Sequence, residues 1–398
     1  MAVVLDLSNT AHCAAATGVQ RVCRQLYAAL AEIGAEPAPA IYDPYARHWR
    51  PPNAAESTLL HPAAAESPGQ KRREVWTFGQ KVRGWLHRGA EQDWPELRGA
   101  PLLVPEIFSP KIFAALPELR RPLRGPVAAL FYDAVALRFP QLSPPATVAR
   151  AENYLRELAA FDGVAAISEA SRVELLEQWT RLGVKERPPV EAIPPGISLP
   201  RKPPQPQTAG QLRLSPLILS VGSIEGRKNH RALLEAAEIL WREGRHFQLI
   251  LAGLPRPETA AAALKLAANL QAAGRPLQLA GALSDTRLEE LYAKCRFTVY
   301  PSLYEGYGLP VAESLAHSRP CICGSGGALG EVARSGGCRI VSSCTAEHLA
   351  NAMRELFDDE PLYLHLSSEA AQRRFPTWAD YARRLLTWLE TLPIRNGS

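Results

Sequence analysis

The chain has 398 residues, of which 46% are hydrophobic and 21% are charged. At typical domain sizes of about 100–200 residues, this length predicts two globular domains that can each bury a core. The apolar fraction and the ordinary glycine content exclude the disordered, collagen-like and small disulfide-stabilised classes. A formal net charge of +5 is too small to indicate nucleic-acid binding, although it is compatible with anionic ligands.

Seven cysteines are scattered without the paired C-x-x-C spacing of a structural zinc site, so we expect free thiols. The opening residues, MAVVLDLSNT, lack the basic and long apolar regions of a signal peptide. No stretch reaches the ~18 apolar residues that span a bilayer. We therefore expect a cytoplasmic protein with reduced thiols.

The first half of the chain alternates short apolar runs with helix-periodic stretches. It begins with AVVLDL and a helical pattern that extends to Leu30, and an irregular region is expected from about Asp43 to Ala100. Later apolar runs are PLLVP at 101, VAALFY at 127, GVAAI at 163 and VEAIP at 190. This alternation predicts a parallel sheet with helices on both faces, and we assign residues 1–200 to this N-terminal domain.

Nine prolines lie between Arg187 and Pro216 without a helical period, which predicts a stiff interdomain linker. The alternation restarts after it, and we assign 201–375 to a second doubly wound domain. Its expected strands are 216–223, 247–253, 276–281, 297–302, 320–325 and 338–343, and its expected helices are 228–243, 257–273, 284–294 and 310–317.

Ligands of open α/β sheets bind beyond the carboxyl ends of the strands. Three strand-to-helix junctions of the second half are rich in glycine or charge there, namely VGSIEGRKN, YPSLYEGYGLPVAES and CGSGGALGE. The first places Ser223, Arg227 and Lys228 before a helix, where cationic side chains and free N–H groups favour an oxyanion such as pyrophosphate. A solvated helix entry is the alternative interpretation of the two basic residues.

The second junction combines glycines with two glutamates. Gly306 and Gly308 remove side chains where phosphates could approach the main chain, and Pro310 suits the first turn of a helix. Glu313 lies about one turn inside that helix, where the helix dipole alone explains an acid. Glu305 has no such explanation, because it stands in a loop at the mouth of the sheet.

These segments resemble a known family. LYEGYGLPVAESLAHSRPCICGSGGALGEV closely resembles the donor-site signature of the retaining glycosyltransferases of family 4, whose two glutamates are separated by seven residues, as Glu305 and Glu313 are. SVGSIEGRKNHRALLEAAEIL resembles the phosphate-binding junction of that family, and AISEASRVEL with IPPGIS resembles its interdomain crossing. TGVQRVCRQLYAAL is similar to the N-terminal segment of members that build bacterial surface polysaccharides.

The resemblance implies the GT-B fold, in which two doubly wound Rossmann-like α/β domains face a central cleft. A C-terminal helix at about 376–398 would pack back on the first domain. The implied activity is that of a retaining, metal-independent hexosyltransferase without a cofactor. It would move a sugar from a nucleotide-sugar donor to a saccharide acceptor, which we expect to be lipid-linked, in surface polysaccharide synthesis.

The resemblance also implies roles for individual residues. Glu313 would accept hydrogen bonds from the ribose hydroxyls, and Glu305 would face the hydroxyls of the donor sugar. Lys228 and Arg227 would neutralise the pyrophosphate leaving group, which is the main catalytic need in breaking a glycosyl–phosphate bond. The other candidates for binding the nucleotide sugar are Ser223, Gly306, Gly308, Leu309 and Pro310.

Two positions depart from the family pattern. Many members have an arginine where Ser223 stands, so Arg227 is expected to supply the second positive charge. The first domain often carries two adjacent glycines, whereas Gly18 stands alone. Asp133 could position the acceptor, with a helix-capping or loop role as the alternative. The candidates for the acceptor or the reaction-centre loop are Gly18, Gln20, Arg21 and Asp133.

Residues 71–88 form a separate, basic amphipathic pattern, with Val75, Phe78, Val82, Trp85 and Leu86 on one helical face. Such helices bind anionic bilayers, which suggests peripheral attachment to the inner face of the plasma membrane. An ordinary surface helix is the other interpretation, since Gly79 and Gly84 weaken the helix.

Two other functions are weighed against glycosyl transfer. A nicotinamide-dependent dehydrogenase needs G-x-G-x-x-G after a first strand, and neither half of the sequence has it. A catalytically weakened GT-B protein that binds a sugar nucleotide or scaffolds a polysaccharide-synthesis complex stays open. No motif supports nucleic-acid binding.

Overall fold

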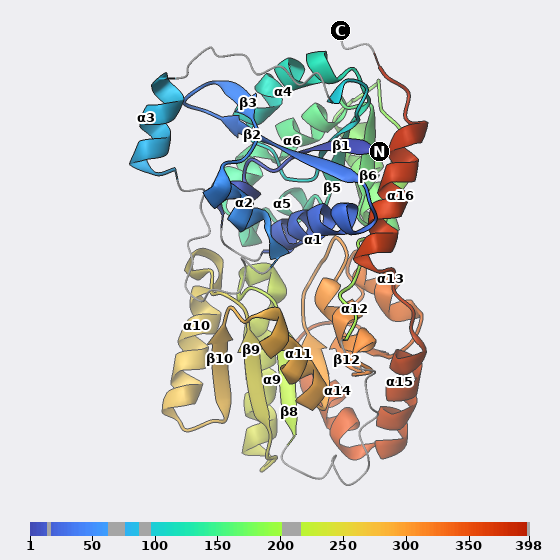
Figure 1. Cartoon of the computed structure of the whole chain (residues 1–398). Coiled ribbons are helices and arrows are strands. Elements are labelled where there is room, and N and C mark those ends of the chain that lie inside the picture. The colour runs from blue at the N-terminus through green and yellow to red at the C-terminus, as the bar shows by residue number, and fades with distance from the viewer. Residues whose placement is uncertain (14–16, 63–75, 87–96, 201–215, 396–398) are drawn as a thin grey trace. The chain divides into compact units, whose positions relative to one another are not determined.

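The structure is a computed structural model that describes residues 1–13, 17–62, 76–86, 97–200 and 216–395 (Figure 1). The chain divides into two compact units. Unit 1 comprises Met1–Tyr132, Glu152–Gly196 and Pro376–Ser398, and unit 2 comprises Asp133–Ala151 and Ile197–Phe375. The division expected at residue 200 therefore differs in two places, because the boundary falls after Gly196 and Asp133–Ala151 groups with unit 2.

Unit 1 is built on a seven-stranded sheet of order β3-β2-β1-β4-β5-β6-β7, with every pairing parallel except β2–β3. Strands β4, β5 and β6 are wholly buried, as expected of a sheet with helices on both faces. The strands are β1 (Ala2–Asp6), β2 (Glu36–Asp43), β3 (His48–Arg50), β4 (Leu102–Val104), β5 (Val127–Phe131), β6 (Gly163–Ala166) and β7 (Val190–Ala192).

Two expectations for this half need correction. The region from about Asp43 to Ala100 is not simply irregular, since it contains β3, which pairs with β2 at the edge of the sheet, and two helices. The expected linker begins too early, because β7 pairs with β6 in the sheet. Its residues 201–215 lie outside the described residues.

The helices of unit 1 surround this sheet. The last of them, α16, lies beside α1 (Figure 1). A Cβ on Gly196 would lie 2.5 Å from the main chain of Trp378, so glycine allows the chain before unit 2 to pass the start of α16. The helices are α1 (Gly18–Glu32), α2 (Ala54–Leu60), α3 (Phe78–Leu86), α4 (Pro110–Leu123), α7 (Glu169–Arg181) and α16 (Trp378–Thr391), while α6 (Pro145–Leu158) runs from unit 2 into unit 1.

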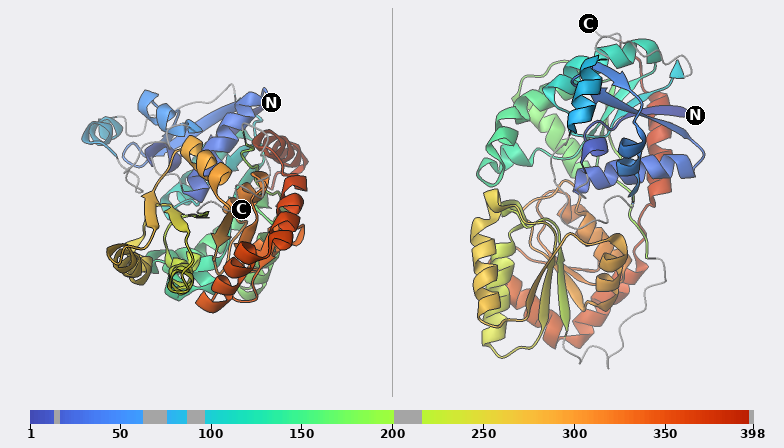
Figure 2. Two further views of the ribbon diagram at one scale, coloured as in Figure 1. Left: turned by 90° about the horizontal axis from the view of Figure 1, so that it is seen from below. Right: turned by 60° about the vertical axis from the view of Figure 1, so that its left-hand side comes forward.

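Unit 2 has a six-stranded, wholly parallel sheet of order β10-β9-β8-β11-β12-β13. Helices lie on both of its faces, which confirms the doubly wound fold (Figure 2). The strands are β8 (Leu217–Val221), β9 (Gln248–Ala252), β10 (Leu277–Gly281), β11 (Phe297–Tyr300), β12 (Cys321–Cys323) and β13 (Cys338–Ile340). The helices are α5 (Val135–Arg138), α9 (His230–Arg242), α10 (Pro257–Ala272), α11 (Asp285–Lys294), α12 (Leu309–Ala316), α13 (Leu329–Arg334), α14 (Ala346–Asp358) and α15 (Glu360–Gln372).

The strand order of unit 2 defines where a ligand can bind. From β8 the chain adds β9 and β10 on one side, and it then returns to add β11, β12 and β13 on the other side. The loops after β8 and β11 therefore diverge at the carboxyl ends of these neighbouring strands. Open α/β sheets bind their ligands at this topological switch point.

All seven cysteines are free, and five of them are buried. No cluster of three or more His, Cys, Asp or Glu side chains in the described ranges could hold a metal ion. None of the helices in the described part of the chain has the length and apolar character needed to cross a bilayer.

Two buried carboxyl groups lie at the carboxyl ends of the neighbouring strands β1 and β4. Asp6 ends β1 with no exposed surface, and Glu106 follows β4 and is 1% exposed. The N–H groups of Asn9 and Thr10 donate to Glu106 at 2.7 and 2.6 Å, and that of Ser8 donates to Asp6 Oδ1 at 3.1 Å. Asp6 Oδ2 has no hydrogen-bond partner, so it can carry a proton without losing a bond.

This carboxyl pair makes stability depend on pH. Burial raises the pKa of Asp6 to about 6, and burial together with the Asp6 charge raises the pKa of Glu106 to about 8. Both values exceed those of the unfolded chain, so this pair binds more protons in the folded state between about pH 4 and pH 8, and its contribution to stability falls as the pH rises through that range.

We expect Asp6→Asn to remove part of this pH dependence. Relative to the parent, the variant should gain several degrees in melting temperature at pH 8 and show a smaller loss between pH 5 and pH 8, since 1 kcal/mol corresponds to about 2–4 °C. Thermal unfolding at both pH values measures the effect. The exposed Glu118 supplies the control, Glu118→Gln, which should keep the parent's slope. If Asp6→Asn loses as much melting temperature between pH 5 and pH 8 as the parent does, the carboxyl pair is not the source of this pH dependence.

Candidate functional site

Three loops meet at the carboxyl edge of the unit 2 sheet. They follow β8, β11 and β12, which are neighbours. The Leu303 N–H donates to the Arg227 carbonyl at 2.9 Å, and the Ala328 N–H donates to the Glu305 carbonyl at 3.0 Å. The three glycine- or charge-rich junctions of the sequence are therefore joined through their main chains.

Glycine is required where these loops approach each other. A Cβ on Gly326 would lie 2.1 Å from the carbonyl oxygen of Leu303, and one on Gly327 would lie 2.4 Å from that of Glu305. Gly308, with φ of 99°, begins α12 in the left-handed region. These glycines hold the loop that carries Glu305 against the loop that follows β12.

The Glu305 carboxylate lies at the centre of the site and is 7% exposed. Its Oε2 is 2.9 Å from Nη1 of Arg227, and its Oε1 is 2.5 Å from Nζ of Lys228. The hydroxyls of Tyr300 and Ser302 donate to Oε1 at 2.9 and 2.5 Å. Residues from the loops after β8 and β11 thus converge on one carboxylate.

The electrostatics of the site favour the charged forms of Glu305 and Arg227 and oppose that of Lys228. Burial alone would raise the pKa of Glu305, but Arg227 and Lys228 outweigh it and hold that pKa at about 2. Burial opposes the charge of Arg227, yet Glu305 and Glu225 raise its pKa above the ordinary value. Burial lowers the pKa of Lys228, and Glu305 offsets part of that effect. Arg256 also pairs with Glu225 at 3.3 Å, so these three cations face two carboxylates.

Glu313 occupies a second buried position, one turn into α12, and is 4% exposed. The Tyr292 hydroxyl donates to its Oε2 at 3.2 Å. The Tyr292 ring stacks on His317 with 4.8 Å between centroids, and Nδ1 of His317 lies 2.9 Å from the Glu313 carbonyl. A hydroxyl from the neighbouring helix α11 therefore fixes the carboxylate.

The remaining nucleotide-sugar candidates surround these side chains. Ser223 lies in the turn after β8 and is partly exposed, and Gly306 is buried beside Glu305. Leu309 and Pro310 open α12, where main-chain N–H groups lack partners within the helix. These residues belong to the loops of the switch point.

Asp133 belongs to unit 2, and its Oδ1 accepts a hydrogen bond from the Val135 N–H at 3.2 Å. Its role in positioning the acceptor stays a prediction. Burial raises its pKa, and the charge of Arg227 lowers it, so Asp133 lies within the field of the site. Nearby, the Arg138 guanidinium lies 4.8 Å from the centroid of the Tyr304 ring. Such contacts join Asp133–Ala151 to unit 2.

Gly18, Gln20 and Arg21 lie in the first turn of α1 in unit 1. Gly18 is exposed, whereas Gln20 is 7% exposed and accepts a hydrogen bond from the Thr17 hydroxyl. Their approach to the reaction centre stays a prediction.

Sequence reasoning missed the polar residues that hold the charged ones. Tyr300, Ser302 and Tyr292 bind the two glutamates, and Glu225 pairs with Arg227 at 3.1 Å. One sequence feature could have identified Tyr300 as a site residue, namely its position at the carboxyl end of a buried strand. Tyr292 lies on a helix that carries no motif, so only the folded structure reveals its contact.

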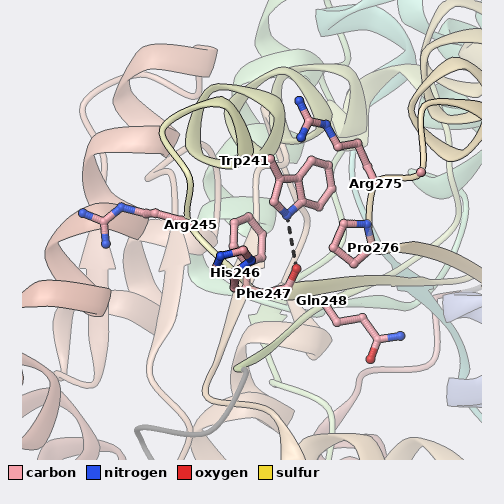
Figure 3. Close-up of a pocket in the computed structure, with 8 residues that line it drawn as sticks. Trp241, Arg245, His246, Phe247, Gln248, Arg275 and Pro276 are labelled. Atoms are coloured by element: carbon pink, nitrogen blue, oxygen red, sulfur yellow. Dashed lines mark hydrogen bonds between the residues drawn. The ribbon is translucent and has the colours of Figure 1, made fainter.

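A separate pocket of about 390 Å³ lies where β9 and β10 begin, at the opposite end of these strands (Figure 3). Arg245 and Arg275 line it together with the Trp241 indole, which donates to the Phe247 carbonyl. Arg245 is 2.6 Å from Asp358, and Arg275 is 2.8 Å from Glu238. Both guanidinium groups therefore already have carboxylate partners.

Comparison with known proteins agrees with this geometry. Residues 208–373 match the family described as "Glycosyl transferases group 1". The serotype-specific mannosyltransferase WbdA of Escherichia coli is 31% identical over 167 residues, which are 42% of this chain and 20% of that protein. The O-antigen chain mannosyltransferase B of Escherichia coli is 30% identical over 169 residues, 42% of this chain and 44% of that one. The chain thus spans less than half the length of these relatives.

Solved structures match over both units. Sucrose-phosphate synthase from Thermosynechococcus elongatus is 19% identical, with a TM-score of 0.69 and coverage of 98% of each chain. Anabaena HepE in complex with UDP and glucose is 15% identical, with a TM-score of 0.66 and coverage of 98% of this chain and 99% of that one. At this identity the likeness concerns the fold. Residues 208–373, which lie in unit 2, therefore match the group 1 glycosyltransferases in sequence, and the chain as a whole has the GT-B fold.

Proposed function

We propose that the protein is a hexosyltransferase that moves a sugar from a nucleotide-sugar donor to a saccharide acceptor, with retention at the anomeric carbon. The observation that carries the proposal is the buried contact of Arg227 and Lys228 with Glu305 at the switch point of the group 1 domain. Such paired cations stabilise a diphosphate leaving group, on which negative charge accumulates as the glycosyl bond breaks.

The ion pairs of Arg227 and Lys228 support this use of the two cations. Both cations pair with Glu305, a residue of the site itself, and Arg227 also pairs with Glu225. A bound diphosphate would supply the same negative charge and release Glu305 to accept hydrogen bonds from the sugar hydroxyls. Glu313 would accept hydrogen bonds from the ribose, and the main chain at Gly308 and Leu309 would bind the phosphate and sugar.

The proposed reaction needs no covalent nucleophile and no metal ion. The bond between the anomeric carbon and the phosphate oxygen breaks while the acceptor oxygen bonds to that carbon on the same face. The acceptor hydroxyl proton passes to the departing phosphate oxygen. The cationic side chains neutralise charge that a divalent ion would otherwise neutralise.

The relatives suggest the substrate class. The two relatives described above are both named as mannosyltransferases, and one of these two is also named for an O-antigen chain. We therefore propose a mannosyl or related hexosyl donor and a lipid-linked saccharide acceptor in surface polysaccharide synthesis. The acceptor would contact unit 1, where Gly18, Gln20 and Arg21 are the candidates.

Donor binding should raise the melting temperature of the protein. We expect one member of a panel that includes GDP-mannose, UDP-glucose, UDP-galactose and dTDP-rhamnose to do so, because a ligand at 100 times its Kd stabilises by about 2.7 kcal/mol. Differential scanning fluorimetry measures the shift. A catalytically weakened protein would bind the donor without releasing nucleotide when acceptor is present. If no nucleotide sugar of the panel raises the melting temperature, this result counts against the proposal.

Lys228→Ala should reduce kcat/KM at least about 100-fold, because it removes a buried cation from the leaving-group site. Glu305→Gln should be similarly inactive, since it keeps the size of the side chain and loses its charge. Initial rates of nucleotide release with acceptor present measure the effect.

The control for Lys228→Ala is Lys265→Ala, which removes an exposed lysine from α10 of the same unit. It should have parental rates. Thermal unfolding of each variant checks that the fold is retained. Parental rates in Lys228→Ala and Glu305→Gln would refute the proposed site.

We also propose that α3 attaches the protein to the inner face of the plasma membrane. The helix contacts unit 1 through Gly84, where a Cβ would lie 2.8 Å from Asp43 Oδ1, and through Gln80, which donates to Glu56 at 3.3 Å. Its apolar side chains point away from that contact. The exposed fractions are 83% for Phe78, 41% for Val82, 64% for Trp85 and 68% for Leu86.

The charge on α3 supports an anionic bilayer as the partner. Lys81 and Arg83 lie on the same helix as these apolar side chains, and both are exposed. An aromatic and basic surface of this kind suits the headgroup boundary of anionic lipids. The remaining residues of the amphipathic pattern, 71–75 and 87–88, lie outside the described residues.

Replacing both aromatic residues should weaken membrane binding. The double variant Phe78→Ala, Trp85→Ala should lower partitioning into phosphatidylglycerol-containing vesicles more than about tenfold, since each buried large side chain contributes roughly 1.5–3 kcal/mol. Vesicle flotation measures this. Leu364→Ala, which removes a 44% exposed leucine from unit 2, should float like the parent. If the double variant floats with the vesicles as well as the parent does, α3 is not the membrane attachment.

A further inference from the structure

Tyr300 joins two charged groups of the site through one hydroxyl. The residue ends β11 and is 3% exposed. Its hydroxyl accepts a hydrogen bond from Nζ of Lys228 and donates one to Oε1 of Glu305 at 2.9 Å. The Lys228 ammonium also lies 4.8 Å from the centroid of the Tyr300 ring. Both polar and aromatic parts of the side chain therefore contact the lysine.

The direction of these hydrogen bonds is determined by the chemistry of the partners. An ammonium group can only donate, and an ionised carboxylate can only accept. The single hydroxyl proton of Tyr300 must therefore point to Glu305, while a lone pair faces Lys228. Burial raises the pKa of Tyr300 well above its ordinary value, so the phenol keeps this proton. The three side chains form one oriented unit.

Tyr292 has the corresponding contact with the second glutamate. It lies on α11, is 1% exposed, and donates to Glu313 Oε2 at 3.2 Å. Its hydroxyl is also 3.4 Å from the Pro310 carbonyl, at the start of α12. The two tyrosines are eight positions apart in the sequence, as the two glutamates are. Each glutamate is thus held by a different buried hydroxyl.

We infer that Tyr300 and Tyr292 are positioning residues that act on separate ends of the donor. Tyr300 sets Lys228 and Glu305 at the pyrophosphate and sugar end, where charge changes during the reaction. Tyr292 sets Glu313 at the nucleoside end, where contacts stay the same in the ground and transition states. The inference rests on the proposed function.

The two roles predict different kinetic changes. Tyr300→Phe keeps the ring and removes the hydroxyl, so kcat should fall roughly tenfold or more while the donor KM changes little. Tyr292→Phe removes a contact that contributes equally to substrate and transition-state binding, so KM should rise roughly tenfold with kcat unchanged. A general loss of packing would produce no such division.

Tyr363→Phe is the matched control. Tyr363 is also in unit 2, is 1% exposed, and donates its hydroxyl to the Arg296 carbonyl at 2.9 Å. This substitution also removes one buried tyrosine hydroxyl, but it leaves the candidate site unchanged. Its kcat and KM should be parental, and thermal unfolding should show all three variants folded.

Double-mutant cycles test whether Tyr292 acts through Glu313 and not through Glu305. Affinities for UDP and GDP are measured by isothermal titration calorimetry in Tyr292→Phe, Glu313→Gln and the double variant. We expect Tyr292→Phe to have little further effect once Glu313→Gln is present, because the contact is already lost. Combined with Glu305→Gln, Tyr292→Phe should keep its full effect.

The steady-state experiment uses GDP-mannose and UDP-glucose as donors. A fall in kcat for Tyr300→Phe together with a rise in KM for Tyr292→Phe would support the inference. If the parent turns over a donor and both variants behave like Tyr363→Phe, the inference is overturned while the proposed function stands. If the parent neither binds UDP or GDP nor turns over a donor, the proposed function fails and the inference fails with it.

Discussion

The contact of Glu305 with Arg227 and Lys228 is the interaction on which the candidate site depends. Two adjacent cations in a buried loop repel each other and lose hydration, so they need a counter-charge. Glu305 supplies it from the loop after the neighbouring strand, with its carboxylate oxygens 2.9 and 2.5 Å from the two cationic groups. The parallel sheet makes this pairing possible, because the loops after β8 and β11 leave the same edge.

Other features of unit 2 keep this carboxylate in place. Gly326 and Gly327 allow the loop after β12 to contact the backbone around Glu305, where any side chain would clash with a carbonyl oxygen. Tyr300 and Ser302 add hydroxyl donors. For the proposed reaction, this means that the cations are already oriented before a diphosphate binds. Preorganised charges of this kind need no reorientation when the leaving group develops its charge.

In unit 1, the residue patterns of the sequence predicted some strands and helices and missed others. The apolar runs at 101, 127 and 163 were sufficient to predict β4, β5 and β6, because strands buried on both faces are continuously apolar. The strand β3 and the helix α2 were missed, since short elements with mixed polarity have no clear period. For α3 the periodicity predicted the helix but left its orientation open. The structure orients it through Gly84, whose missing side chain allows close contact with Asp43.

The sequence alone determined the doubly wound class, the strand-to-helix junctions, and the residue types that meet a nucleotide sugar in the family resemblance. Those properties are local, since they depend on period, glycine placement and the spacing of Glu305 and Glu313. Only the tertiary structure decided that Asp133–Ala151 groups with unit 2 and that Tyr300 and Tyr292 each hold one glutamate. Such contacts join residues from different elements, and no local pattern in the sequence encodes which side chains the packed sheet and helices bring together.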